Sequence, residues 1–577
     1  MGVRAFAQRG PLVMAVAASA ASAMASCAPL PSDDCSVLHE CTTPEGGADA
    51  IGQDGAMGQE AEIQGIDADG GSDQWSGDAS TGGDAPPDAV RESAACDPTK
   101  SPHDDPCVIG EPLGVFVSPV GADGNPGTRA LPLHTLAQAM DVARASGKHR
   151  VYACAGAFAE LLVVGASRDG MAVYGGLDCA RWSYGSQSRV TVAPTRPGYA
   201  LDIEGLVQGV TFEDIDFVAQ DASGTNPGES SIAAFVSGSQ NVAFHRVSIT
   251  AGLASDGAPG ASGGPTPDGG NTGGRTNWLG IPPYDELNGN DATGAVGAPQ
   301  KTCKCPDGTT SVGGSGGGSS DGGAEAAGAG APVYEPDAGA DLVGRNGASC
   351  GAGGVPPQNG FDGPNAMSGA PGQSLGSVVA TGWTPAASVP GLNGMPGQGG
   401  GGGGNGPGGV GGGGGGACGG CGGAGGKPGG PGGSSIALLS YQSTIDLVAC
   451  TLVAGHSGAG GAGGDGQSGQ PGSLFAGNGG HSGCQGAAGG SGAGGNGGQG
   501  GAGGVSVGIG YAGSPPTFDG APVAPAAFLP GVAVGAGGLG RRKGAAGPAA
   551  VTSVGQPQPG ADGAPGFSGI AQAVLGF

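Results

Sequence analysis

The sequence is short of the residues that build large apolar cores and catalytic centres. Aromatic residues make up 4% of its 577 residues, charged residues 12%, and histidine occurs seven times. Basic residues are scarce as well, because 21 Lys and Arg stand against 47 Asp and Glu, which gives a net charge of −26. Nucleic acid and anionic membrane surfaces repel so acidic a chain. The apolar residues are concentrated in residues 113–252, with a return at 434–455, so we expect the packed core there.

Glycine takes the place of the missing residues, with 136 Gly beside 45 Pro. Glycine occupies every third position from Gly477 to Gly504, and the same period runs from Gly391 to Gly415. Each glycine loses much backbone entropy on ordering and offers no side chain to bury, so this is not the sequence of an enzyme core. A period of three fits an extended left-handed helix with three residues per turn. The segments 256–433 and 456–504 are therefore predicted to be structural or tethering.

Three structures are open for these glycine-rich segments. Collagen has the same period but needs proline to stiffen each chain, and residues 477–504 contain none. Extended glycine strands could instead pack on one another through backbone hydrogen bonds. Disorder is the third, and it is our default for the low-complexity sequence outside the strict repeats.

The N-terminal residues 1–26 have the features of an export signal. Arg4 and Arg9 precede an apolar stretch, residues 11–23, that is too short to span a bilayer. The following Met24-Ala25-Ser26-Cys27 resembles the bacterial lipobox. The resemblance implies that Cys27 carries palmitate and anchors the protein in the cell envelope, at the outer membrane or cell surface. Ordinary cleavage after Ala25 or Ser26 is the alternative, and both predict export.

An acidic segment follows, and residues 27–110 are predicted to be a disordered tether. Between Pro31 and Glu92 there are 15 Asp and Glu against one basic residue, Arg91. Such a segment repels itself and cannot bury enough apolar surface to fold. It has neither EF-hand nor nonapeptide calcium spacing. We therefore predict no cofactor, with calcium left open but unsupported by a motif.

Three segments align with one another: residues 200–219, 231–251 and 435–454. Each has a short apolar strand, a polar turn and two alternating strands, a unit that cannot bury its own apolar face. The pattern predicts an all-β fold, a single-stranded right-handed parallel β-helix over residues 111–255 with a returning coil at 434–455. Residues 505–577 are expected to hold a weak further return and a low-complexity tail. The predicted inward positions are Val210, Phe212, Ile215 and Phe217, matched by Val242, Phe244, Val247 and Ile249.

The segment before these repeats carries a family resemblance. A strand at residues 115–119 leads into the turn-rich residues 121–128, then Pro132 and a helical stretch at 134–144. This order resembles the opening of bacterial pectin-lyase-like β-helix proteins. The resemblance implies an N-terminal capping helix with Leu136, Ala139, Met140 and Ala143 on its apolar face. It implies little about activity, since one fold hosts many functions.

The repeat alignment also nominates one cluster for chemistry. Outward positions stack Glu213 on His245, Asp214 on Arg246 and Asp216 on Ser248. Asp214, Asp216 and Arg246 have the residue types that a calcium-dependent lyase of this fold would use, which makes them candidate catalytic residues. A solvated face of opposite charges on adjacent coils is the alternative and the expected one.

The chain holds 14 cysteines, and export places them in an oxidising compartment. We predict disulfides between Cys96 and Cys107 and between Cys154 and Cys179. The pairs Cys303/Cys305 and Cys418/Cys421 have the count for zinc but a poor spacing, so disulfides that pin the insert are favoured. Cys450 falls on an inward core position and is predicted to stay free.

Two functions remain open. The first is a cell-surface lipoprotein with a structural, adhesive or envelope-interaction role, in the manner of the glycine-rich (PGRS-like) repeat proteins that it resembles. Its partners would be the membrane, through the lipid anchor, and surface polysaccharide or envelope proteins. The alternative is a polysaccharide-binding or polysaccharide-degrading protein of the lyase type. The basic cluster Arg541-Arg542-Lys543 is interpreted as an exposed turn.

Overall fold

The computed structural model of the chain describes residues 96–263, 296–320, 323–324, 327–334, 356–367, 374–407, 410–474, 476–550 and 556–577. They belong to one compact unit, Arg91–Phe577. The export signal, Cys27 and the predicted tether as far as residue 95 lie outside the described residues. Residues 96–110, which were also predicted to be disordered, are instead ordered, because Val108 and Ile109 are buried and Cys96 is bonded to Cys107. None of the helices in the described part of the chain has the length and hydropathy of a membrane span.

Most of the ordered elements are strands, arranged in three sheets that we call A, B and C. All pairs in these sheets are parallel except β23 with β24. Sheet A consists of β1 (Gly114–Val117), β2 (Arg150–Cys154), β5 (Met171–Leu177), β8 (Val210–Glu213), β11 (Val242–His245), β20 (Ile445–Val448), β23 (Thr517–Phe518) and β24 (Ala521–Pro522). Sheet B consists of β3 (Gly156–Phe158), β6 (Val190–Val192), β9 (Ile215–Val218), β12 (Ser248–Thr250), β21 (Thr451–Ala454) and β25 (Val532–Val534). Sheet C consists of β4 (Leu162–Val164), β7 (Leu201–Glu204), β10 (Ser231–Ser237), β19 (Ser435–Tyr441), β22 (Ser506–Ala512) and β26 (Ala571–Gly576).

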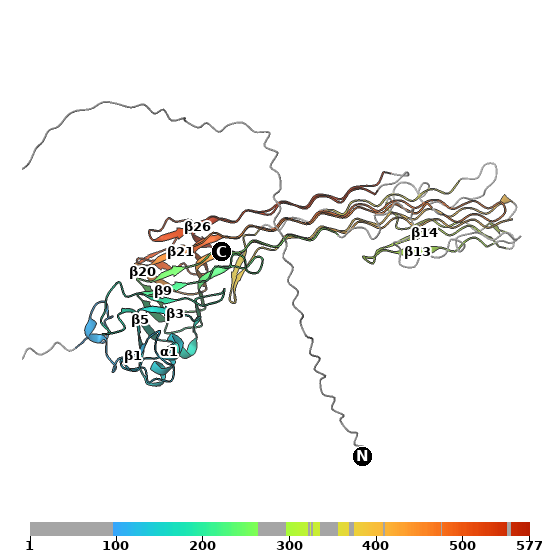
Figure 1. Cartoon of the computed structure of the whole chain (residues 1–577). Coiled ribbons are helices and arrows are strands. Elements are labelled where there is room, and N and C mark those ends of the chain that lie inside the picture. The colour runs from blue at the N-terminus through green and yellow to red at the C-terminus, as the bar shows by residue number, and fades with distance from the viewer. Residues whose placement is uncertain are drawn as a thin grey trace, which may run out of the picture. The chain divides into compact units, whose positions relative to one another are not determined.

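From β2 onward the chain visits the three sheets in the order A, B, C, with hairpin β23–β24 as one visit to sheet A, and each circuit lies on the one before (Figure 1). Val242 pairs with Val210 on one side and with Ile445 on the other, so the three aligned segments are neighbours in the predicted register. The further return is confirmed too, because β22 pairs with β19. An interval of 183 residues in sequence therefore separates two adjacent circuits.

The core lies between the sheets and is built from alternate residues of each strand. All eight predicted inward residues are at most 2% exposed, namely Val210, Phe212, Ile215, Phe217, Val242, Phe244, Val247 and Ile249. Phe212 stacks on Phe244 of the next circuit with ring centroids 5.8 Å apart. Because strands side by side carry the same kind of residue at the same register, similar side chains pile up along the core.

Each end of the core is covered. Helix α1 (Leu136–Ala145) packs on β1 and β2, and its predicted apolar face is confirmed, since Leu136, Ala139, Met140 and Ala143 are fully buried. Thr135 caps this helix by accepting a hydrogen bond from the Gln138 N–H, and short 3₁₀ turns occur at Pro106–Val108 and Ala166–Arg168. At the other end the loop after β24 lies over the last circuit, with buried Val523 and a hydrogen bond from the Ala526 N–H to the Val574 carbonyl.

Three short hairpins belong to the first glycine-rich insert. They are β13 (Lys301–Lys304) with β14 (Thr310–Gly313), β15 (Ser319–Ser320) with β16 (Gly323–Ala324), and β17 (Ser377–Val379) with β18 (Gly382–Thr384). The last of them covers an outer face of sheet C, where Val378 and Trp383 pack against Phe235 and Leu439. The insert therefore contributes to the packing of the strand sheets.

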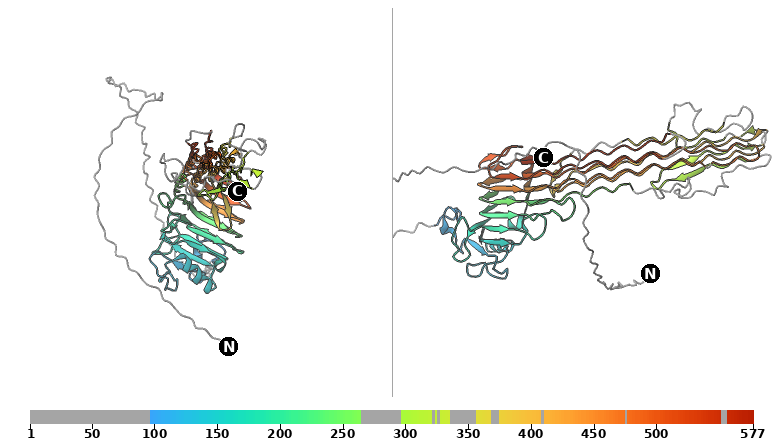
Figure 2. Two further views of the ribbon diagram at one scale, coloured as in Figure 1. Left: turned by 90° about the vertical axis from the view of Figure 1, so that its right-hand side faces the viewer. Right: turned by 45° about the horizontal axis from the view of Figure 1, so that its top comes forward.

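The glycine-rich segments form a bundle that continues from the sheets (Figures 1 and 2). The chain leaves sheet B after β12, β21 and β25, and it returns each time to the start of the next sheet C strand, β19, β22 or β26. The bundle strands are held mainly by backbone hydrogen bonds to one another. Of the structures considered, extended glycine strands are the one found, and disorder is not the state of the described glycine-rich residues.

Glycine recurs every third residue in the sequence, and the direction of the backbone hydrogen bonds also repeats every third residue. Within residues 484–504, Gly495 donates to Gln467, Asn496 to Leu392 and Gly497 to Ala561, at 2.8 to 2.9 Å, and the next three residues repeat these directions. Each strand thereby contacts several neighbours through three rows of backbone groups. A Cβ on Gly495 would lie 2.1 Å from the Ala424 carbonyl oxygen, so a side chain does not fit in this row. Glycine at every third position is the requirement of that packing.

The C-terminal segment differs from the expectation of weak strands and a low-complexity tail. Residues 536–548 and 558–569 are a third outgoing and returning pair of bundle strands, which hydrogen-bond to each other and to residues 494–504. Arg541 lies on one of these strands, so the basic cluster is not a turn. The period of three in Gly560, Gly563, Gly566 and Gly569 is the sequence feature that would have indicated this pair.

Candidate functional site

The candidate residues lie at one corner of the strand sheets, where the chain passes from sheet A to sheet B. Asp214 follows β8 and Arg246 follows β11, and each turns the chain with a positive φ, 56° and 54°. The Asp214 N–H donates to the His245 carbonyl at 3.1 Å, which fixes the stacking of one circuit on the next. This left-handed backbone is costly for a residue with a side chain, so the corner is held by its surroundings.

Arg246 connects the two buried carboxylates of the corner. Its Nε donates to Asp214 Oδ1 at 3.1 Å, and its Nη2 donates to Glu213 Oε2 at 2.7 Å and to Asp214 Oδ2 at 3.1 Å. The side chains of Glu213 and Asp214 are only 8% and 4% exposed. Their charges are therefore balanced by the guanidinium and not by water.

Two further residues complete the cluster, and the sequence did not point to either. Arg189 donates to both carboxylate oxygens of Asp216 and to the Arg246 carbonyl, and it lies 3.6 Å from Asp214 Oδ1. The Tyr184 hydroxyl donates to Asp214 Oδ2 at 3.1 Å. Both come from the segment before β6, which does not align with the repeats, so the alignment could not place them.

The electrostatics follow from these contacts. Burial acts to raise the pKa of Glu213, but the hydrogen bond from His245 and the charge of Arg246 outweigh it and hold that pKa below its usual value. The hydrogen bond with Glu213, 3.1 Å long, raises the pKa of His245 against the opposing effect of its partial burial. The imidazole is therefore biased toward its charged form beside the carboxylate.

The arrangement leaves no carboxylate oxygen of Glu213, Asp214 or Asp216 without a donor. A calcium ion takes several oxygen ligands, so these carboxylates would first have to release their guanidinium partners. Within the described ranges, no group of three or more His, Cys, Asp or Glu is placed to hold a metal ion. The geometry is that of a closed ion-pair network.

The cysteines that have the ligand count for zinc are joined in disulfides. Cys303 is bonded to Cys418 and Cys305 to Cys421, so the two pairs tie hairpin β13–β14 to a bundle strand. The predicted disulfides Cys96–Cys107 and Cys154–Cys179 are confirmed, and Cys484 is also disulfide-bonded. Cys450 is free and buried, as its inward position predicted.

In comparisons with protein-family models, curated proteins and solved structures, the chain has no match. The site is therefore interpreted from its own chemistry alone.

Proposed function

We propose that the chain is an exported lipoprotein, anchored through Cys27, with a structural, adhesive or envelope-interaction role at the cell surface. The glycine bundle carries this proposal. Its strands present backbone to one another, and the side chains that lie buried between them are mostly small, such as those of Ala417, Ser491 and Ala493. Such a body offers an extended surface, which suits a structural or adhesive role.

We also infer that the strand sheets are a single right-handed parallel β-helix of the pectin-lyase-like kind, with α1 over its first circuit. The fixed order in which the chain visits sheets A, B and C supports it. The parallel pairing of each strand with its counterpart one circuit away supports it as well.

The corner at Asp214, Asp216 and Arg246 has a structural role in this proposal. Buried carboxylates that are already paired with guanidinium groups stabilise the stacking of adjacent circuits, and they are not free to bind calcium or to abstract a proton. A polysaccharide lyase remains the alternative function. Incubating the purified chain with uronic-acid polymers and calcium, while recording the absorbance of unsaturated products, separates the two, since our proposal expects no product.

Anchoring is tested by the variant Cys27→Ser. We expect the protein to move from the membrane fraction to the periplasm or medium, because a lipidated cysteine is its attachment to the membrane. Cys35→Ser is the matched control and should stay in the membrane fraction. Retention of Cys27→Ser in membranes would contradict the lipoprotein assignment.

A further inference from the structure

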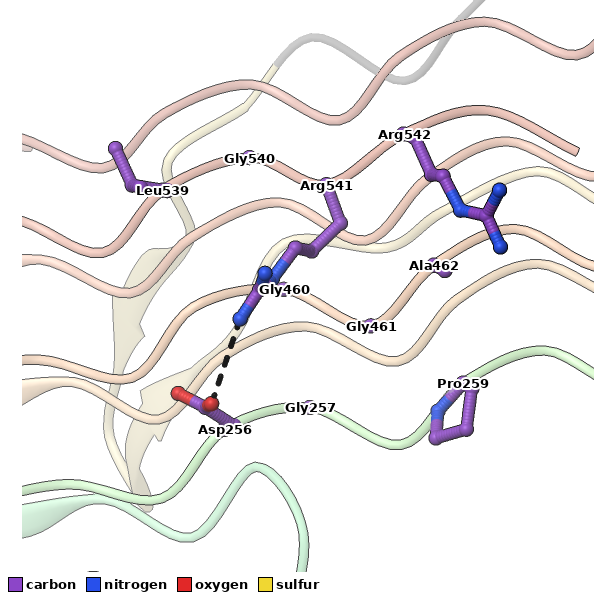
Figure 3. Close-up of a pocket in the computed structure, with 10 residues that line it drawn as sticks. All are labelled: Asp256, Gly257, Pro259, Gly460, Gly461, Ala462, Leu539, Gly540, Arg541 and Arg542. Atoms are coloured by element: carbon purple, nitrogen blue, oxygen red, sulfur yellow. Dashed lines mark ion pairs between the residues drawn. The ribbon is translucent and has the colours of Figure 1, made fainter. Parts of the chain in front are cut away.

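An open groove lies across three neighbouring bundle strands (Figure 3). The strands run through residues 251–263, 453–469 and 535–548, and they are parallel, since Gly257 donates to Ala459 and Gly460 donates to Leu539. The groove has a volume of about 410 Å³. Glycine backbone forms its floor, and the side chains of Asp256, Pro259, Leu539, Arg541 and Arg542 line it.

On this face of the bundle, side chains supply acceptors to backbone N–H groups that no strand satisfies. Asp256 accepts from the Ala459 N–H at 2.7 Å, and Ser262 accepts from the Asp465 N–H at 3.2 Å. Pro259 occupies the same place between these two residues, opposite Ala462, and its side chain has no acceptor. The Ala462 N–H consequently has no acceptor among the residues that the structure describes.

The next strand repeats this interruption. His456 accepts from the Ala536 N–H and Asp465 from the Ala545 N–H, each at 2.8 Å. Ala459 and Ala462 lie between these two accepting side chains and have no acceptor of their own. Leu539 and Arg542 lie opposite them, and their N–H groups therefore have no acceptor in the described chain. The groove thus lies where no side chain accepts a hydrogen bond from these backbone N–H groups.

Two guanidinium groups border the same place. Arg541 reaches across Gly460 toward Asp256, at 3.6 Å, and both side chains of this pair are about half exposed or more, 49% and 66%. Arg542 has no ion-pair partner over the described part of the chain. Exposed pairs of this kind are weak, so a ligand oxyanion can replace Asp256 at Arg541. The floor and rim offer donors, and the carboxylate of Asp256 keeps its hydrogen bond from the Ala459 N–H when Arg541 turns to the ligand.

We propose that this groove binds an acidic polysaccharide through an oxyanion on one of its sugar rings. Guanidinium and backbone N–H groups together match a carboxylate or sulfate ester. The flat glycine floor and the aliphatic side chains of Pro259 and Leu539 suit the face of a pyranose ring. The inference rests on the proposed surface role and names the ligand class and the site for it. Because the whole chain is acidic, recognition depends on these local donors and not on long-range attraction.

The direct test is calorimetric titration of the purified chain with trigalacturonate, with the neutral trigalactose as its counterpart. We expect binding of the acidic sugar alone, and about tenfold weaker binding by Arg542→Ala, the loss typical of one hydrogen bond to a charged group. Arg181→Ala removes the same charge from an exposed site elsewhere and should bind like the parent chain. Equal binding of the neutral sugar, or no effect of Arg542→Ala, would overturn the proposal.

A second pair of variants tests the open N–H group. Pro259→Asn places an acceptor over the Ala462 N–H, as Asn359 does for Ala488 at 3.0 Å, and should abolish binding while the fold is kept. Pro259→Ala leaves that N–H open and removes only the apolar contact of the proline ring, so it should weaken binding far less than Pro259→Asn does. A sulfated trisaccharide in place of trigalacturonate identifies which oxyanion is preferred. Inorganic sulfate that binds as tightly as either sugar would reduce the groove to a small-anion site and refute the proposal.

These outcomes are independent of the proposed function as a whole. Membrane fractionation of Cys27→Ser tests anchoring without a ligand, and titration of the groove variants tests ligand binding without a membrane. A chain that is anchored but does not bind acidic sugars would retain the first proposal and lose the second.

Discussion

At the scale of single residues, the inward position decides what a side chain can do. Cys450 follows β20 at the place that Ile215 and Val247 hold on the two preceding circuits, and it is 4% exposed. Its sulfur donates to the Phe244 carbonyl at 3.2 Å. Burial raises the pKa of this thiol to about 11, so the reactive thiolate is suppressed. A cysteine in that position is preserved as a small apolar group.

The variant Cys450→Val should therefore be almost neutral, with a loss of about 1 kcal/mol or less in unfolding free energy, as for a volume-conserving core exchange. Leu447→Ala, one inward place earlier in the strand, is the control and should cost about 2 to 5 kcal/mol because it leaves a cavity. Denaturant unfolding measures both. Thiol labelling should modify Cys450 only after unfolding, and rapid labelling of the native protein would contradict the buried position.

The pair of Glu213 and His245 makes the stability depend on pH in a defined direction. The pKa of His245 is raised, so its contribution is complete below 6.5, its ordinary value, and is lost as the pH rises through the folded pKa. The pKa of Glu213 is lowered, so its contribution is complete above its ordinary value of 4.5 and is lost as the pH falls through the folded pKa. Both contributions are complete between these two values.

His245→Gln should consequently destabilise the protein most between pH 4.5 and 6.5, and less as the pH rises further. Urea unfolding of the parent and the variant at intervals of pH gives this difference directly. Arg246 and Asp446 also face the imidazole, and the charge of Arg246 lowers the pKa of His245 while that of Asp446 raises it. His149→Gln, which removes an imidazole without a hydrogen-bond partner in the described chain, is the matched control. A difference that grows above pH 6.5 would exclude the pair as its source.

At the scale of elements, the sequence predicted what repeats and missed what does not. The register of β8, β11 and β20 followed from alternation of apolar residues, because strands that share a core must present the same face. Helix α1 followed from its apolar face. Arg189 and Tyr184 could not be foreseen, since they reach the corner from an irregular segment. The hairpin of β17 and β18 was equally hidden, because its position on sheet C is set by contacts far apart in sequence.

The bundle strands differ in how predictable they were. Strict glycine period marked the described part of residues 477–504, where each row faces another backbone. The strand with Arg541 breaks that period, because Arg541 stands in the row of Gly538 and Gly544 and its side chain passes out over the groove. A search for glycine at every third position therefore misses this strand, because Arg541 interrupts its period. The glycines that pack against it at that point belong to the neighbouring strands.

Gly495→Ala tests whether the glycine rows are packed as the bundle requires. The added Cβ would lie 2.1 Å from the Ala424 carbonyl oxygen, so neighbouring backbone must separate, and we expect a loss of about 1 to 3 kcal/mol as for overpacking of a core. Gly165→Ala is the control, because a Cβ there meets nothing within 4 Å. Thermal unfolding compares the two. A neutral Gly495→Ala would mean that residues 484–504 are not packed against residue 424.

At the scale of the whole molecule, the glycine excursions and the strand sheets depend on each other. Loop-closure entropy alone suggests that a long surface excursion can be removed at little cost, because that entropy grows slowly with length. The hydrogen bonds argue otherwise. Residues 412–433 accept bonds from residues 458–480, and residues 414–432 donate bonds to residues 484–502, so the first excursion supports the second. Its hairpin of β17 and β18 also covers the outer apolar face of sheet C.

Deletion of residues 257–432 should therefore unfold more than the deleted segment. Residues 458–504 would lose the hydrogen-bond partners that the first excursion supplies to them in two rows. Their amides should exchange with solvent far faster, because each buried N–H without an acceptor destabilises the bundle. Hydrogen exchange followed by mass spectrometry resolves this effect from that on sheet A, whose core residues have no partner in the deleted segment and should stay protected. Deletion of residues 524–528, in the loop after β24, serves as a control that leaves the bundle rows intact. Unchanged protection of residues 484–504 in the larger deletion would show that the second excursion is stable alone, and that the bundle is an array of independent hairpins.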